Sequence, residues 1–264
     1  MVCYEVDPLR MNTDSPSVAT PEFRRAPHPI LPAYFSDEPG RIERVRQLFD
    51  SAASDYDRIN RLMSFGSGAF YRGDALRRFG ISPGDRVLDV GSGTGVIAKL
   101  AQALVGNEGL VVALDPSAGM LAQARSSGVR CIVPGRGERL PFADATFDRL
   151  TMGYALRHVA DLDTAFAEYR RVLRPGGRVL LLEITRPRSD TGMRALRWYM
   201  HKLVPRFARS GDAAELMRYY WETIEHCVPP ETILASLSAA GFATVRREVR
   251  LSIFSEYSAS VTAA

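Results

Sequence analysis

The residues best suited to chemistry surround a glycine-rich turn in the stretch VLDVGSGTG (residues 87–95). Asp89 stands in a short apolar run, and Gly91, Gly93 and Gly95 alternate before a stretch of helical character. Glycines let a backbone bend sharply and approach a ligand closely, and the first amide groups of a helix are free to bind that ligand. A dinucleotide-binding turn has the different spacing G-x-G-x-x-G. The carboxylate beside the turn favours an amino group or another cation over a pyrophosphate.

A second carboxylate, Asp115, ends the next apolar run, GLVVALD (residues 109–115). It follows Gly95 by twenty residues, as expected if one helix separates two neighbouring parallel strands. A carboxylate at that strand end can accept hydrogen bonds from both hydroxyls of a ribose. The alternative is an ordinary aspartate at the end of a strand.

Alternating strand and helix patterns between residues 86 and 184 would position both carboxylates. This order predicts an α/β fold with a doubly wound, mostly parallel sheet. The later segment ATVRREVRLSIFSEYSA (residues 243–259) alternates with a period of two and predicts an antiparallel pair at the sheet edge. Ligands of such sheets bind at the carboxyl ends of the strands, which is where Asp89 and Asp115 are expected.

The pattern also predicts how the chain is divided. Residues 1–40 contain seven prolines, which excludes regular helices and central strands and predicts an arm that is partly disordered or lies over the domain. Residues 41–264 form one domain, with a helical lead-in over 41–80. An insert at about 186–229 breaks the alternation, and its apolar helical face would make it a cap over the strand ends.

Composition excludes several classes of protein. The net charge is +4, but the 34 basic residues include two lysines and therefore 32 arginines, scattered among acidic residues. Nucleic-acid binding would instead predict basic clusters. The three cysteines lack metal-ligand spacing and suit a reducing cytoplasm. We expect no metal, no signal peptide and no membrane span.

Four motifs, in order, resemble class I S-adenosylmethionine-dependent methyltransferases: LDVGSGTG, LDPSAGML, ERLPFADATFDRL and RVLRPGGRVLLLE. The resemblance covers about residues 41–257 and implies a Rossmann-like, seven-stranded, mostly parallel sheet with an antiparallel edge strand and a helical cap. It implies S-adenosylmethionine as cofactor, with its methionine part held by Asp89 and the glycine turn and its ribose held by Asp115. The other implied cofactor contacts are Tyr56, Ser92, Thr94, Pro116, Met120, Arg136, Gly137, Glu138 and Tyr154. Arg136 stands where the class often has Asp or Asn.

The stretches FDSAASDYDRINRLMSFG, YALRHVAD and RVLRPGGRVLLLEIT resemble more closely the UbiE/Coq5 group, which methylates a ring carbon of ubiquinone and menaquinone precursors. This chain departs from the group at Gly68 and Tyr71, where His and Trp are usual, at His158 in place of Asn, and at Thr185 in place of Ser. The resemblance implies C-methylation of a small aromatic or quinol-type acceptor. The alternatives are methylation of a specialised metabolite at carbon, oxygen or nitrogen, a non-catalytic cofactor-binding protein, and a nucleotide-dependent oxidoreductase.

Arg157 and His158 are the predicted catalytic residues, because they follow the strand beside which the methyl group should lie. Arg157 would stabilise a phenolate or orient a water, unless it pairs with a nearby Asp; His158 would titrate near neutrality, unless it faces away. The predicted acceptor contacts are Met63, Phe65, Tyr71 and Trp198, and the insert offers further lid or pocket candidates in Tyr199, Tyr219, Tyr220 and Trp221. The apolar, basic insert leaves open a peripheral membrane contact, a homodimer contact, or packing on its own domain.

Overall fold

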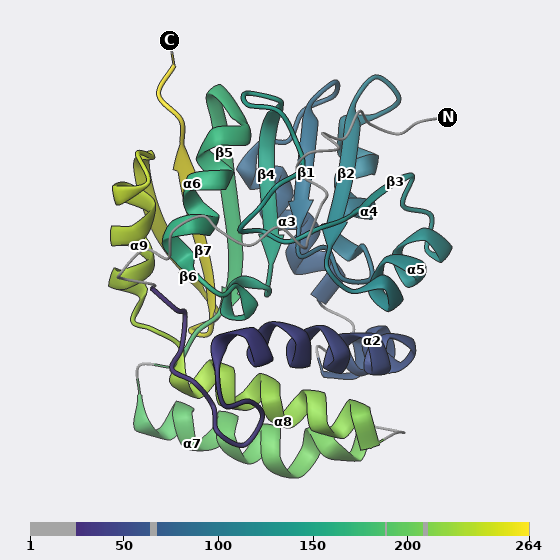
Figure 1. Ribbon diagram of the computed structural model, residues 1–264, viewed down its shortest axis with the longest axis vertical. Helices are drawn as coiled ribbons and strands as arrows, with labels where there is room; N and C mark the ends of the chain where they lie inside the picture. The colour runs from purple at the N-terminus through teal and green to yellow at the C-terminus, as the bar shows by residue number, and fades with distance from the viewer. Residues whose placement is uncertain (1–24, 64–67, 188, 208–210, 264) are drawn as a thin grey trace.

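The computed structural model describes residues 25–63, 68–187, 189–207 and 211–263. Seven strands form one sheet in the order β3-β2-β1-β4-β5-β7-β6 (Figure 1). The strands are β1 (Arg86–Val90), β2 (Leu110–Asp115), β3 (Cys131–Pro134), β4 (Phe147–Gly153), β5 (Leu173–Ile184), β6 (Ala243–Arg250) and β7 (Phe254–Ser260). The first five are parallel. The predicted α/β sheet is confirmed, with one refinement: the antiparallel strand β7 lies one position inside the edge strand β6.

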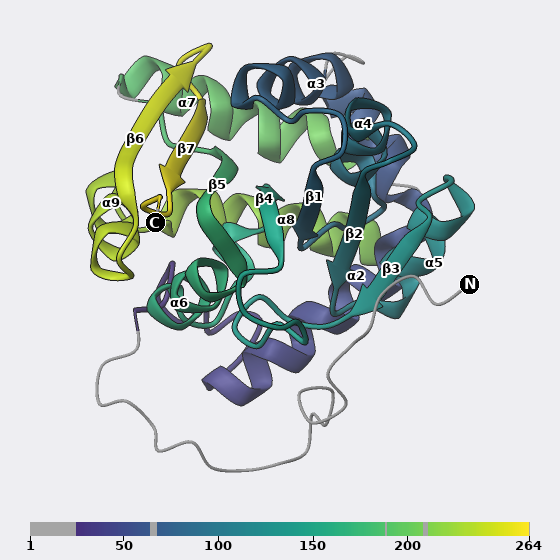
Figure 2. The same ribbon diagram turned by 90° about the horizontal axis from the view of Figure 1, so that it is seen from above.

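Helices cover both faces of the sheet (Figure 2). The central strands are buried almost throughout, as in β1, where only Arg86 is partly exposed, so they need an apolar layer on each side. One face packs on α3 (Gly68–Phe79), α4 (Val96–Val105) and α5 (Ala118–Ser126), and the other on α6 (Leu162–Val172) and α9 (Pro230–Ala239). Ser117 caps α5 through its Oγ, which accepts a hydrogen bond from the Met120 amide at 3.1 Å.

A separate helical layer lies across one end of the sheet, below the strands in Figure 1. It consists of α2 (Glu38–Met63), α7 (Asp190–Trp198), the π-helical turn η2 (Tyr199–Leu203), the 3₁₀ turn η3 (Val204–Phe207) and α8 (Gly211–His226). The first part of the predicted helical lead-in is the single helix α2 of 26 residues. The apolar faces of α2 and α8 share a third hydrophobic cluster with the chain before α2.

The described part of the N-terminal arm lies against the domain. The Arg25 carbonyl accepts a hydrogen bond from the Leu162 amide at 3.0 Å, and the Pro27 carbonyl accepts one from the Val228 amide at 2.8 Å. Leu31 and Phe35 are buried in the cluster shared by α2 and α8. The predicted disorder falls on residues 1–24, which lie outside the described residues. Within the described ranges, no helix has the length and apolar character needed to cross a membrane.

Candidate active site

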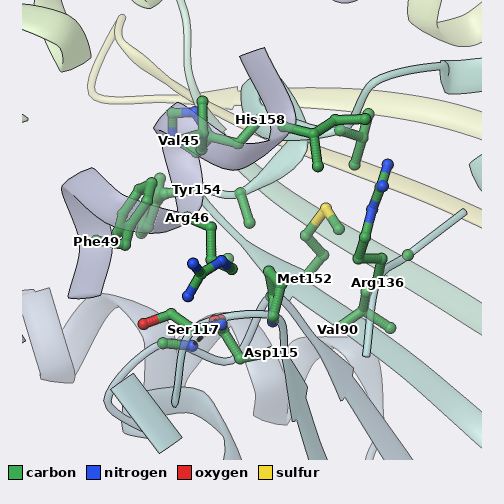
Figure 3. Close-up of a pocket in the computed structure, with 18 of the residues that line it drawn as sticks. Val45, Arg46, Phe49, Val90, Asp115, Ser117, Arg136, Met152, Tyr154 and His158 are labelled. Atoms are coloured by element: carbon green, nitrogen blue, oxygen red, sulfur yellow. Dashed lines mark hydrogen bonds between the residues drawn. The ribbon is translucent and has the colours of Figure 1, made fainter. Parts of the chain in front are cut away.

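A cavity of about 140 Å³ lies between α2 and the carboxyl ends of the parallel strands (Figure 3). Its walls come from segments far apart in the sequence: α2, the glycine turn, the end of β2, the loop after β3, the end of β4 and α8. The lining residues predicted from the sequence are Tyr56, Gly91, Gly93, Asp115, Pro116, Arg136, Gly137, Glu138, Tyr154 and His158. A second cavity of about 40 Å³ is lined by Tyr56, Arg72, Asp89, Gly91, Ser92, Gly93, Thr94, Val96, Ile97, Gly153 and Tyr154.

Asp89 provides a buried carboxylate at the second cavity. Its Oδ1 accepts a hydrogen bond from Thr151 Oγ1 at 2.8 Å, whereas its Oδ2 has no partner among the described residues. Burial raises the pKa of the Asp89 carboxyl to about 7. A buried carboxylate oxygen without a donor is costly, so this position suits a ligand that brings a cation or a hydrogen-bond donor.

Asp115 connects the end of β2 to the glycine turn. Its carboxylate accepts hydrogen bonds from the amides of Gly93, at 2.8 Å, and Ser117, at 2.9 Å. Burial raises its pKa to about 6. The carboxylate is therefore held in a fixed orientation beside the cavity, with lone pairs left for ligand hydroxyls.

The glycines of the turn serve different purposes. A Cβ on Gly91 would lie 2.5 Å from the Ala155 Cβ, and one on Gly95 would lie 2.5 Å from Val129 Cγ2; both residues have positive φ. Gly95 lines neither cavity and permits α4 to approach α5 closely. The space around Gly93 is open, which leaves this part of the turn to a ligand.

Helix α2 is fastened over the site by two carboxylates that the sequence analysis did not single out. Asp50 Oδ1 accepts hydrogen bonds from Ser117 Oγ at 2.6 Å and from the Gly119 amide at 2.9 Å. Asp57 Oδ1 accepts one from Thr94 Oγ1 at 2.5 Å. On the N-terminal side of Asp50, α2 contributes an apolar and basic roof whose lining residues are Ile42, Val45, Arg46 and Phe49. In Figure 3, Arg46 extends from this roof over Ser117 and Asp115.

The loop after β3 forms another wall of the larger cavity. Arg136 forms an ion pair with Glu138, with 3.5 Å between Nε and Oε2. Glu138 also accepts a hydrogen bond from the Ala160 amide, so this loop is bonded to the segment that carries His158. Met120, predicted to flank the adenine, is fully buried and lines neither cavity, and its amide donates a hydrogen bond to the Ser117 cap of α5.

His158 is enclosed by aromatic side chains at the larger cavity. Its ring centroid lies 5.1 Å from that of Phe49 and 5.4 Å from those of Tyr219 and Tyr220. Nδ1 lies 3.3 Å from the Tyr219 hydroxyl, and Nε2 has no partner among the described residues. Burial, and then the nearby Arg157 guanidinium, lower the pKa of His158 well below its usual value. The imidazole is therefore neutral at pH 7.

Arg157 is placed differently from its neighbour. It is fully buried, lies 3.4 Å from Glu183 in an ion pair, and stacks on the Tyr220 ring at 5.1 Å. It lines neither cavity, whereas the Tyr220 ring on which it stacks lines the larger one. The ion pair considered as the alternative is present, with Glu183 as the partner in place of an Asp.

Of the predicted acceptor contacts, the two whose side chains are described, Tyr71 and Trp198, line neither cavity. The Tyr71 hydroxyl donates a hydrogen bond to Glu256 at 2.8 Å, and its ring packs on Phe254 at 4.8 Å. Trp198 is 59% exposed on α7. Met63 ends α2 with its side chain outside the described part, and Phe65 lies outside the described residues. The insert contributes Tyr220 instead, whose hydroxyl lies 2.7 Å from that of Tyr56.

The two cavities together fit S-adenosylmethionine. The free Oδ2 of Asp89 suits the ammonium of its methionine part, and the fixed Asp115 carboxylate suits ribose hydroxyls. Tyr154, at φ 63°, lines both cavities and joins them. No cluster of potential metal ligands occurs among the residues that the structure describes.

Comparisons with known proteins identify the family of this chain. The model of the ubiE/COQ5 methyltransferase family matches residues 39–252. The ubiquinone/menaquinone biosynthesis C-methyltransferase UbiE of Saccharophagus degradans is 34% identical over 218 residues, 80% of this chain and 88% of that protein. The UbiE of Xanthomonas axonopodis pv. citri is 38% identical over 210 residues, 75% of this chain and 82% of that protein.

Solved structures show the same fold. A SAM-dependent methyltransferase from Thermotoga maritima has a TM-score of 0.59 at 20% identity, covering 81% of this chain and 98% of its own. The phosphoethanolamine N-methyltransferase 2 of Haemonchus contortus has a TM-score of 0.61 at 18% identity, covering 86% of this chain and 61% of its own. The chain belongs to the ubiE/COQ5 methyltransferase family and is an S-adenosylmethionine-dependent methyltransferase.

Proposed function

We propose that this enzyme methylates a ring carbon of a hydroxylated aromatic acceptor of the quinol type. Relatives 34 to 38% identical over most of the chain are C-methyltransferases of ubiquinone and menaquinone biosynthesis. The observation that carries the proposal here is the aromatic enclosure of His158 at the larger cavity, formed by Phe49, Tyr219 and Tyr220. Of these rings, Phe49 and Tyr220 also line the cavity, and flat aromatic walls beside one neutral proton acceptor suit a planar ring that carries a hydroxyl group.

His158 supplies the acid–base chemistry in this proposal. With its proton on Nδ1, beside Tyr219, Nε2 accepts the proton of the ring hydroxyl. The electron pair left on that oxygen raises the electron density of the neighbouring ring carbon, which takes the methyl group. This carbon then loses its own proton to solvent as aromaticity returns, and the imidazolium returns the hydroxyl proton to the ring oxygen, so one proton is released in all. S-adenosylmethionine supplies an electrophilic methyl group to this site when bound.

The surrounding elements exclude water and orient the acceptor. Helix α2, held by Asp50 and Asp57, and Tyr220 of α8 cover the site from the solvent side. The hydrogen bond between the Tyr56 and Tyr220 hydroxyls ties these two helices together across the cavity. A covered, preformed site contributes to catalysis by positioning the reacting groups.

The test is an acceptor panel with S-adenosylmethionine carrying a ¹³C methyl group. Demethylmenaquinol, a ubiquinol precursor with a free ring carbon, an unprenylated hydroquinone and an aromatic amine are supplied in turn, and the methylated atom is read from carbon chemical shifts. We expect a methyl group on ring carbon. Transfer to oxygen or nitrogen alone would overturn the proposal, and turnover of the unprenylated ring alone would assign the enzyme to a specialised metabolite. A peripheral membrane contact and a homodimer stay predictions.

A further inference from the structure

At the second cavity, Arg72 has no acidic partner among the residues that the structure describes. It lies on α3, lines that cavity, and makes no ion pair or hydrogen bond among the described residues. Other arginines near the site are paired: Arg46 with Asp50 at 2.7 Å, and Arg78, on the same helix, with Glu256 at 2.7 Å. Arg72 therefore differs from its neighbours in keeping its charge available to a ligand.

The Tyr154 ring supports this guanidinium. The Arg72 Cζ lies 4.7 Å from the ring centroid, a cation–π contact that fixes the position of the charge without using its N–H groups. Tyr154 adopts the left-handed backbone conformation, at φ 63°, which is rare for a residue with a Cβ. Such conformations are concentrated at functional sites, and here the strained residue carries the aromatic support.

The second cavity thus has one free group of each charge. Asp89 is its acidic residue, with Oδ2 unpartnered, and Arg72 is the basic residue among its described lining. They make no ion pair with each other. A zwitterion satisfies both at once, because its ammonium can donate to Asp89 and its carboxylate can accept the two parallel N–H groups of Arg72.

We propose that Arg72 binds the α-carboxylate at the amino-acid end of the cofactor and so makes the enzyme selective for the zwitterionic form of that end. The resemblance gives the methionine part of the cofactor to Asp89 and the glycine turn, and it names no basic residue for the carboxylate of that part. Arg72 fills that role from α3, a helix outside the glycine motif. The proposal does not depend on the identity of the acceptor.

The experiment is calorimetric binding of two product analogues in the absence of acceptor. One is S-adenosylhomocysteine, and the other is the same molecule without its carboxylate. We expect the wild type to prefer the first by about 10- to 100-fold, the range expected for hydrogen bonds to a charged group. Arg72→Ala should lose this preference by weakening only S-adenosylhomocysteine, and Arg72→Lys should keep part of it. Arg77→Ala, an exposed change on the same helix, is the matched control and should change neither affinity.

Three results would overturn the proposal. Equal binding of both analogues by the wild type would do so without any variant. A parallel loss for both analogues in Arg72→Ala would show a general structural role, which thermal melting would reveal, with Arg72→Gln as a milder variant. Unchanged affinities together with a raised KM for the acceptor would assign Arg72 to the acceptor.

Discussion

Binding of the cofactor should release a proton from Asp89. Its carboxyl has a pKa of about 7 because it is buried, so about half of the free enzyme carries this proton at pH 7 and about nine-tenths at pH 6. An ammonium placed at the unpartnered Oδ2 favours the charged carboxylate. We therefore expect about 0.5 proton released on binding S-adenosylhomocysteine at pH 7, about 0.9 at pH 6 and almost none at pH 8.5.

Calorimetry in buffers of different ionisation enthalpy measures this release. Asp115 has a pKa of about 6 and interacts with Asp89, so the pair titrates jointly and the variant Asp89→Asn is needed to isolate the first carboxyl. This variant should bind more weakly and release fewer protons at pH 7. Asp144→Asn, a change at an exposed side chain, should behave as wild type. Equal release by the wild type and Asp89→Asn would refute the reasoning.

The same titration affects the stability of the free enzyme with a definite sign. The rise in the Asp89 pKa from 3.8 to about 7 means that the folded state binds this proton more tightly than the unfolded state. The protonated carboxyl therefore stabilises the folded state, and this contribution is complete below about pH 4. It is lost as the pH rises through 7, which lowers the free energy of unfolding by roughly 4 kcal/mol in all. Asp89→Asn should therefore stabilise the ligand-free enzyme at pH 8, as measured by urea unfolding, while weakening its ligand binding.

Three further predictions concern the surroundings of the cofactor. Arg157→Met or Glu183→Leu alone should lower the free energy of unfolding by about 3–5 kcal/mol, because each leaves a fully buried group unpaired. The double variant Arg157→Met/Glu183→Leu should recover most of this loss, and additive losses would contradict the reasoning. Gly137→Ala would place a Cβ 2.6 Å from the Tyr169 hydroxyl and should lower stability by about 1–3 kcal/mol, with rescue by Tyr169→Phe in thermal melts. His158→Ala should lower kcat by about 10²- to 10⁴-fold with little change in S-adenosylhomocysteine affinity; an unchanged kcat would remove the imidazole from the chemistry.

The cofactor half of the site could be predicted because it depends on local sequence. Asp89 and Asp115 occupy the carboxyl ends of adjacent parallel strands, and that adjacency follows from the alternation of strands and helices. The turn between them requires glycine for steric reasons that the spacing reveals. Such features need only a short stretch of chain and the usual handedness of its connections.

The roof over the site could not be predicted in this way. The period of Ile42, Val45 and Phe49 indicates a helix with an apolar face, but it does not say what that face covers. The anchors Asp50 and Asp57 look like ordinary carboxylates of an exposed helix until their partners on distant segments are known. Long-range docking of this kind is decided by tertiary packing, which helical periodicity does not encode.

For Arg157 and His158, the sequence does not tell which of the two side chains faces the cavity. Both lie in the 3₁₀ turn η1 (Leu156–His158). A 3₁₀-helix has three residues per turn, so consecutive side chains point about 120° apart. One of two adjacent residues can then line the cavity while the other is buried behind it. The sequence identifies the pair but not which member faces the ligand.

The residues at which this chain departs from the family pattern differ in how close they lie to the cavities. Tyr71 is engaged with Glu256 and Phe254, away from both cavities, and Thr185 is buried against Ser255 at 3.0 Å. His158, in contrast, lines the larger cavity within the aromatic enclosure. A difference in acceptor or in proton transfer should therefore follow from His158 more than from Tyr71. Changing His158 to the Asn usual in the family replaces a proton acceptor with an amide and leaves the cofactor-binding residues unchanged. This variant therefore separates the proton transfer of this enzyme from the cofactor binding that it shares with its relatives.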